Sequence, residues 1–182
     1  MGQLRETLGI VGTCVGCAVL YGVAHDLVTA HLSVEYFTVA HPSIGTDDPI
    51  LLALVWGVIA TWWVGVLLGV PLAAAARLGR APRVTAAELR PAILRLLVGM
   101  GVAAAATMLL AALATGDDFS LPGPLFERVP RERHGRLAVA AVGHAVSYFV
   151  GFAGGIALIA RTVRARRRAA CAIAAEGRYT AP

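Results

Sequence analysis

The chain alternates between four long apolar stretches and short polar segments. A helix needs roughly 20 apolar residues to cross the hydrocarbon core of a bilayer, and each stretch has about that length. The pattern therefore predicts an all-α membrane protein, a four-helix transmembrane bundle. The predicted spans cover about residues 8–30, 50–76, 92–115 and 137–160, so that a transmembrane domain over 1–160 precedes a basic tail over 161–182.

The composition agrees with a membrane protein. Of the 182 residues, 58% are hydrophobic and only 15% are charged, whereas about a quarter of the residues of a soluble domain are charged. So few charges cannot cover a water-exposed surface, and the shortage is explained if lipid is the solvent. The lipid bilayer is therefore the first expected partner.

The placement of arginine predicts the orientation of the spans. All 16 basic residues are arginine. Arg5 precedes the first span, five arginines lie within residues 77–95, and six lie within 161–178. The remaining four lie within 128–136, where acidic residues offset them. Because basic residues are enriched in cytoplasmic loops, we expect both termini to be cytoplasmic.

The first span also has the position of a secretory signal peptide, with a small-residue site at Val23-Ala24. Its leading segment is nearly neutral, however, since Glu6 follows Arg5. Cleavage would leave three spans and move one terminus across the membrane. We favour an uncleaved helix, and N-terminal sequencing of the mature protein distinguishes the two.

The cluster from Arg161 to Arg168 lies just inside the predicted membrane. Such a segment attracts anionic lipid headgroups by about 1 kcal/mol per arginine near the surface, so anionic lipid is an expected partner of the tail. The sequence pI of about 9.7 does not make nucleic acid an expected partner, because no aromatic side chains interleave these arginines to stack on bases.

Small residues at four-residue spacing predict close helix packing, most simply within the chain. Pro71 predicts a kink in the second span, which membrane helices tolerate. The glycine pairs are Gly12 and Gly16, Gly65 and Gly69, and Gly151 and Gly155.

Ionisable side chains gather where the first span ends. Such groups are costly in or beside hydrocarbon, need partners and often mark functional sites. Helical spacing aligns Asp26 with Thr29, and His144 with Tyr148 in the fourth span, so both polar stripes are expected to face other helices. His25 and His144 are predicted to lie at a similar depth. The six ionisable residues of this segment are His25, Asp26, His31, Glu35, Tyr36 and His41.

The first candidate chemistry is a transition-metal site at the outer end of the bundle. Imidazole and carboxylate ligands suit zinc, iron, copper or manganese. The Glu-x-x-His pairs of di-iron bundles and the His-rich boxes of membrane desaturases are absent from the sequence. The candidate metal ligands are His25, Asp26, Glu35, His41, His134 and His144.

Three other interpretations stay open. One is haem ligated by His25 and His144 from two helices. Another is redox chemistry at Cys14-x-x-Cys17, although thiols in apolar surroundings stay protonated, and two small core residues explain the pair more simply. The third is purely structural: a buried pair of His144 and Asp26 fixes helix register, with contacts of about 1 kcal/mol each.

Three runs of residues resemble a group of small, uncharacterised bacterial membrane proteins. These are Tyr21-Gly22…His25-Asp26…Thr29, Glu35-Tyr36-Phe37-Thr38…His41-Pro42 and Trp56-Gly57…Ala60-Thr61-Trp62-Trp63-Val64-Gly65. The resemblance carries no activity. It implies a multi-pass protein of the bacterial plasma membrane.

Three functional classes follow. In the first, the chain is an integral membrane protein whose polar cluster is structural or binds a small ligand. In the second, a metal- or haem-dependent membrane enzyme uses the same cluster. In the third, the chain is a transporter subunit, which would have to form a homo-oligomer because four short spans enclose too small a pathway.

Overall fold

The computed structural model describes residues 2–116, 119–124 and 126–179, with side chains described up to residue 175. The described residues form helices and turns without any strand, which confirms the predicted all-α fold. Two short 3₁₀ turns precede the last helix, at Phe126–Arg128 and Arg131–Arg133. The helices are α1 (Gly2–Leu32), α2 (Glu35–Thr38), α3 (Pro49–Ile59), α4 (Trp62–Arg77), α5 (Ala86–Ala114) and α6 (His134–Tyr179).

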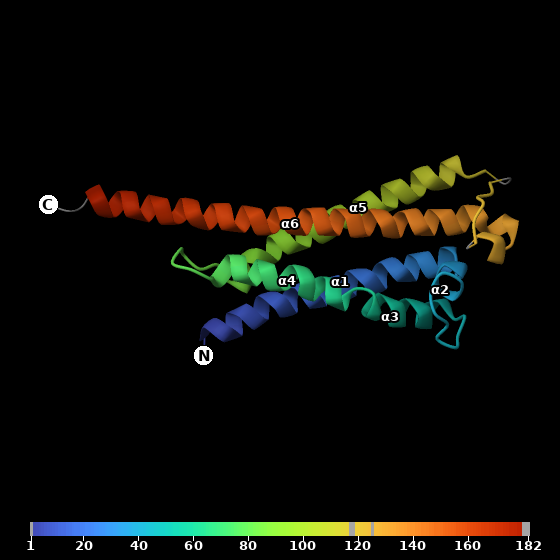
Figure 1. The fold of residues 1–182 in the computed structure, drawn as a ribbon, viewed down its shortest axis with the longest axis horizontal. Coiled ribbons are helices and arrows are strands. Elements are labelled where there is room, and N and C mark those ends of the chain that lie inside the picture. Colours follow the sequence, from blue (N-terminus) through green and yellow to red (C-terminus); the bar gives the residue numbers. More distant parts are fainter. Residues whose placement is uncertain (1, 117–118, 125, 180–182) are drawn as a thin grey trace.

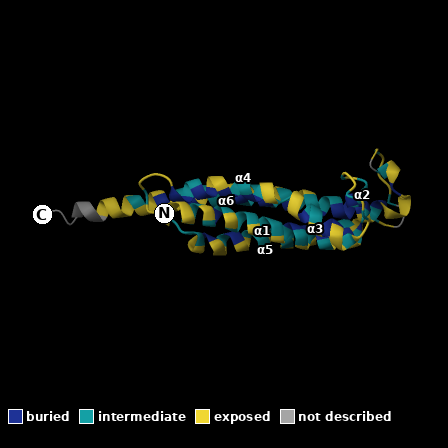
Figure 2. Ribbon diagram, turned by 90° about the horizontal axis from the view of Figure 1, so that it is seen from below, coloured by how far each residue is buried: buried dark blue, intermediate teal, exposed yellow. Residues whose placement is uncertain are grey.

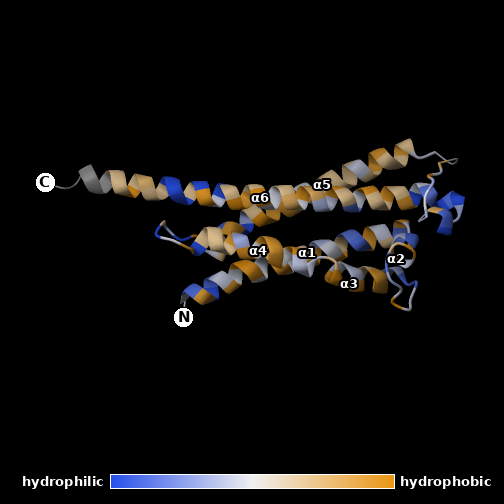
Figure 3. Cartoon of the chain, in the orientation of Figure 1, coloured by the Kyte–Doolittle hydropathy of each residue, from blue (hydrophilic) through white to orange (hydrophobic). Residues whose placement is uncertain are grey.

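Four helical stretches are long and apolar enough to cross a membrane, and the chain is a multi-pass membrane protein. These stretches are Gly2–Leu32, Pro49–Arg77, Ala86–Ala114 and Arg131–Ala175, and each coincides with one predicted span. Large apolar side chains on their outer faces, such as Leu20, Leu113 and Phe149, are exposed as expected for contact with lipid. Figure 3 shows polar residues gathered at the two ends of the bundle.

The helices form two layers (Figures 1 and 2). In the first layer α1 packs along α3 and α4, and in the second α5 packs along α6. Contacts between α4 and α6, and between α1 and α5, join the layers. The amino terminus and the loop between α4 and α5 lie at one end of the bundle, and α2 lies at the other end with the start of α6 (Figure 1).

Glycines hold the first layer together at very short range. A Cβ atom added at Gly57 would lie 2.6 Å from Val23 Cα, and one added at Gly65 would lie 2.6 Å from Val15 Cα. The backbones of α1, α3 and α4 can approach this closely only without a side chain at these positions. Not every predicted glycine pair packs in this way, since a Cβ at Gly12 or Gly16 would meet nothing within 4 Å.

The second span is interrupted at Ala60 and Thr61, between α3 and α4. The Thr61 hydroxyl donates a hydrogen bond to the Gly57 carbonyl, and Tyr148 from α6 donates one to the Ala60 carbonyl at 3.3 Å. These bonds satisfy backbone and hydroxyl groups that the break would otherwise leave without partners. Pro71, where the sequence predicts a kink, lies inside α4.

α6 is much longer than a single membrane crossing. Its 46 residues correspond to roughly 69 Å of helix, about twice the thickness of the hydrocarbon core. The arginines of the predicted tail therefore lie on the continuation of the same helix, and α6 extends past the end of the bundle (Figure 1).

Arg166 anchors this continuation to the first layer. Its side chain is only 7% exposed, and its guanidinium donates hydrogen bonds to carbonyls at the end of α4 and in the loop that follows. These carbonyls carry the partial negative charge of a helix C-terminus, which stabilises a cation there. The acceptors are the carbonyl oxygens of Ala75, Leu78, Ala81 and Pro82.

Candidate functional site

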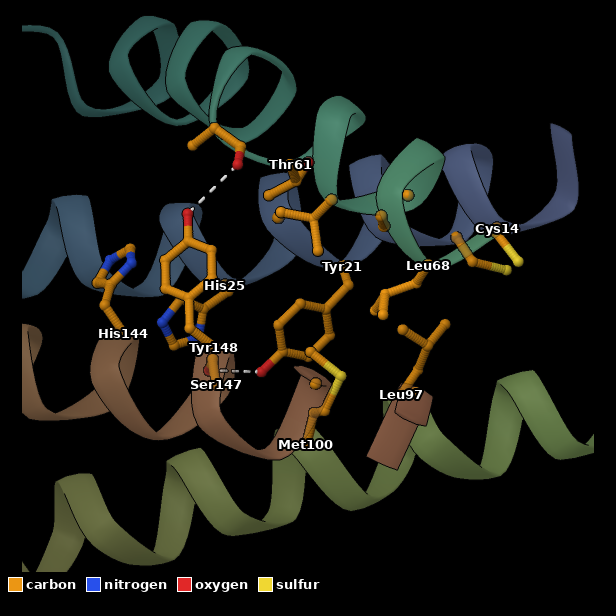
Figure 4. A pocket seen from close by; sticks show the side chains of 18 of the residues that line it. Cys14, Tyr21, His25, Thr61, Leu68, Leu97, Met100, His144, Ser147 and Tyr148 are labelled. Carbon is orange, nitrogen blue, oxygen red and sulfur yellow. Dashed lines mark hydrogen bonds between the residues drawn. The ribbon is translucent and has the colours of Figure 1, made fainter. Parts of the chain in front are cut away.

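A cavity of about 160 Å³ lies between the two layers. Most of its wall is apolar, with Leu68 from α4 and Leu97 and Met100 from α5 among the side chains that face it (Figure 4). The free cysteines Cys14 and Cys17 line its inner part. A mostly apolar cavity with a few polar groups at one end is typical of a small-molecule binding site.

The polar end of the cavity is built from α1, α6 and the break in the second span. Tyr21 and Ser147 share a hydrogen bond of 2.8 Å across the two layers, and Ala60 and Thr61 line the cavity beside Tyr148 (Figure 4). Irregular backbone at membrane depth is tolerated where it is buried in protein or lines a cavity. The interruption of the helix therefore coincides with the candidate site.

His25, Asp26 and His144 form the centre of this polar end. The rings of His25 and His144 meet edge to face with centroids 4.5 Å apart, which confirms that they lie at one depth. His144 Nε2 is 3.2 Å from the Thr29 hydroxyl and 3.7 Å from the Asp26 carboxylate. His144 Nε2 and the Thr29 hydroxyl share this hydrogen bond, and the Thr29 hydroxyl also lies within hydrogen-bond distance of the carbonyls of His25 and Asp26.

Several polar atoms at this end have no protein partner. His25 Nε2 and Trp56 Nε1 are buried without a hydrogen bond among the described residues. Asp26 is only 4% exposed, and its carboxylate lies 3.7 Å from His144 Nε2, beyond hydrogen-bond distance. A buried polar group without a partner costs about 1–3 kcal/mol, so each such group needs an explanation.

α2 covers the polar end of the cavity. Tyr36 stacks on His144 with centroids 4.2 Å apart, and the Phe37 side chain is 1% exposed. His41 lies between Tyr36 and Trp56, and its Nδ1 donates a hydrogen bond to the Tyr36 carbonyl at 2.8 Å. Burial raises the pKa of Tyr36 to about 12, so its hydroxyl keeps the proton at neutral pH.

An ion pair ties α2 to the start of α6. The Glu35 carboxylate accepts hydrogen bonds from the Arg133 guanidinium and from the Ser33 hydroxyl. Burial raises the pKa of Glu35, but the hydrogen bonds from Arg133, the Glu35 backbone and Ser33, together with the charge of Arg133, lower it by more. The net effect is a lowered pKa, and Glu35 is ionised at neutral pH.

We expect Glu35→Gln to lower the melting temperature at pH 7, because it removes this ion pair. The ordinary pKa of glutamate is 4.5 and the folded value is lower. The ion pair therefore contributes its full stabilisation at pH values above the ordinary pKa of glutamate. This contribution is lost as the pH falls through the lower pKa of Glu35 in the folded protein. The difference in melting temperature between the two proteins should shrink as the pH is lowered from about 7 to about 3.

The matched control is Glu127→Gln, which removes an exposed carboxylate at the same end of the molecule. Thermal unfolding of this variant should follow the wild type at every pH. A Glu35→Gln difference that stays constant with pH would contradict the assigned role of the ion pair.

The structure separates the six predicted metal ligands into those that line the cavity and those that contact other groups. Four of them line the cavity: His25, Asp26, His41 and His144. Glu35 is instead engaged by Arg133. The His134 ring is 4% exposed and hydrogen-bonds to the carbonyls of Phe126 and Val129 and to the Ser120 hydroxyl. Within the described ranges no three His, Cys, Asp or Glu side chains are arranged as a metal-binding group, and metal binding stays a prediction.

Sequence reasoning did not single out Tyr21 and Trp56 as site residues. Tyr21 lies one helical turn before His25 on the same face, so the spacing of residues on α1 contained a usable signal. From the sequence alone, Trp56 looks like an interface anchor. Its role in the site could not be predicted, because its contact with His41 depends on how the segment after α1 folds back onto α3.

The role of this site must be argued from its own geometry. No protein-family model, no curated protein and no solved structure matches the chain.

Proposed function

We propose that this multi-pass membrane protein binds a small molecule in the cavity between its two layers, with the polar part of that molecule at His25, Asp26 and His144. The observation that carries the proposal is the set of buried polar atoms on the cavity wall that have no protein partner. A ligand with a polar head would satisfy these atoms, and the apolar wall would receive the rest of the ligand.

A purely structural role for the polar cluster accounts less well than ligand binding for the distances between its polar atoms. Side chains that only hold helices together are expected to reach hydrogen-bond distance, as Tyr21 and Ser147 do at 2.8 Å. Asp26 and His144 stay 3.7 Å apart, and His25 Nε2 faces no acceptor or donor in the described part of the chain.

A haem held between His25 and His144 is not favoured by the geometry. The two rings are in direct contact, so a macrocycle could enter between them only if α1 and α6 moved apart.

The orientation is part of the proposal. Both termini face the cytoplasm, in a bacterial plasma membrane, and the exposed arginines of α6 contact anionic headgroups there without a role in nucleic-acid binding. The support is that the amino terminus, the loop between α4 and α5 and the hydrophilic stretch of α6 lie toward one end of the molecule (Figure 3). A reporter fused after Pro182 that behaves as external would overturn this orientation.

The test is equilibrium binding of radiolabelled 1-octanol to the protein in nanodiscs of zwitterionic lipid, with empty nanodiscs as the blank. We expect saturable binding. Ala18→Leu adds volume on the cavity wall and should weaken that binding about tenfold. Ala24→Leu places the same side chain on the exposed face of the same helix and should leave binding unchanged. Binding that never saturates, or that Ala18→Leu does not affect, would refute the proposal.

A further inference from the structure

We infer that the cavity takes a protonated amine with an apolar chain, an alkylammonium, and that Asp26 is its counter-ion. This inference rests on the proposed function and names the chemical class of the ligand.

The cavity wall carries one acidic side chain and no arginine. Among the described residues that line it, Asp26 is the sole carboxylate, and the remaining polar groups are imidazoles, hydroxyls, thiols and an indole. A buried carboxylate is costly unless a cation or several hydrogen bonds compensate it. Among the described residues no hydrogen bond to the Asp26 side chain is formed, so an ionised Asp26 would present a negative charge without a fixed positive partner.

His144 is a neighbouring side chain that could compensate Asp26 from within the protein. Its Nε2 is directed to the Thr29 hydroxyl at 3.2 Å, and it stays 3.7 Å from the carboxylate. Its ring is further fixed by stacking on Tyr36 and by the edge contact with His25. These contacts hold His144 in place without closing the gap to Asp26.

The hydrogen-bonding capacity of the wall also fits an ammonium group. A protonated primary amine has three N–H donors and no acceptor. The Asp26 carboxylate and the unpartnered His25 Nε2, in the tautomer with hydrogen on Nδ1, provide two acceptors on the same end of the cavity. Tyr21, Tyr36 and Tyr148 line this end, and aromatic rings within about 6 Å attract cations.

The apolar part of the cavity fits an unbranched chain better than a second polar group. From Tyr21 inward the wall consists of Leu68, Leu97, Met100 and neighbouring apolar side chains (Figure 4). A carboxylate ligand would meet Asp26 with no arginine to offset the repulsion. A neutral alcohol could enter, but it would leave the charge of Asp26 uncompensated.

The experiment compares octylammonium, 1-octanol and octanoate, which share one apolar chain and differ in the charge of the head. Binding is measured at pH 7 in nanodiscs of zwitterionic lipid, with partitioning into empty nanodiscs subtracted. We expect octylammonium to bind wild-type protein at least about tenfold more tightly than 1-octanol, and octanoate to bind most weakly.

Asp26→Asn keeps the shape of the side chain and removes its charge. In this variant the affinities for octylammonium and 1-octanol should become equal within about a factor of two. Asp47→Asn, at an exposed position of the loop after α2, is the matched control and should keep the wild-type preference. The wild-type ranking alone tests the inference if Asp26→Asn does not fold.

The outcomes separate the two proposals. If 1-octanol binds saturably but octylammonium binds no more tightly, or if the preference survives in folded Asp26→Asn, the cation inference is wrong and the proposed binding function stands. If none of the three compounds binds saturably, the proposed function itself is wrong.

Discussion

Gly65→Ala should destabilise the bundle, even though alanine favours helix over glycine. The new Cβ would lie 2.6 Å from Val15 Cα and 3.0 Å from the Cys14 carbonyl oxygen. Both contacts are with backbone, so α1 and α4 must separate along part of their length to relieve them. Overpacking of this kind costs about 1–3 kcal/mol, which exceeds the gain of about 0.5–1 kcal/mol from helix propensity.

The matched control for Gly65→Ala is Gly16→Ala, a glycine of the same spacing pattern in α1. A Cβ at Gly16 meets nothing within 4 Å, so only the propensity gain of about 0.5–1 kcal/mol should remain. The free energy of unfolding of both variants can be measured in mixed micelles of mild and denaturing detergent. Effects of equal sign and size in the two variants would contradict the close approach of α1 and α4.

Arg166→Ala is expected to have the second large effect. The buried guanidinium bonds to four carbonyls, including that of Pro82 at 2.7 Å and that of Leu78 at 2.9 Å. Each hydrogen bond from a charged group contributes about 1.5–3 kcal/mol, and removal takes the guanidinium donors away from all four carbonyls. We expect a loss of at least about 2 kcal/mol in the free energy of unfolding, with water replacing part of the lost bonding.

Two further variants show whether this loss of stability comes from the several N–H donors of the Arg166 guanidinium. Arg167→Ala removes an exposed arginine from the next position of α6 and should change the free energy of unfolding by less than about 0.5 kcal/mol. Arg166→Lys keeps the charge but presents its donors from a single nitrogen, so it should recover only part of the stability. Full recovery by lysine would mean that charge, and not the array of bonds to the loop, holds α6 in place.

The fold class and the spans could be predicted because hydropathy and length are local properties of the chain. The shared depth of His25 and His144 followed from helical rise, and the contact of their rings confirms it. The break at Ala60 and Thr61 could not be predicted in the same way. Neither residue is a helix breaker, and the Ala60 carbonyl is satisfied by Tyr148 from a helix 88 residues away.

The contacts of the candidate metal ligands could not be predicted from local sequence patterns either. Sequence shows that Glu35 and His134 are polar and close to the outer end, but not which groups they contact. Glu35 is engaged by Arg133, 98 residues later in the chain, and His134 is enclosed by the turn that precedes α6. Only the tertiary structure separates the residues that line the cavity from those that stabilise its surroundings.

Charged side chains connect the two layers near each end of the bundle. Glu35 and Arg133 join them at the end where α2 lies, and Arg166 joins them at the opposite end. The layer of α1, α3 and α4 is closely packed, because glycine contacts hold α1 against both halves of the second span. The cavity can therefore widen mainly by a change in the angle between the layers. If one of these two contacts were lost, the layers would separate at that end and rotate about the remaining contact.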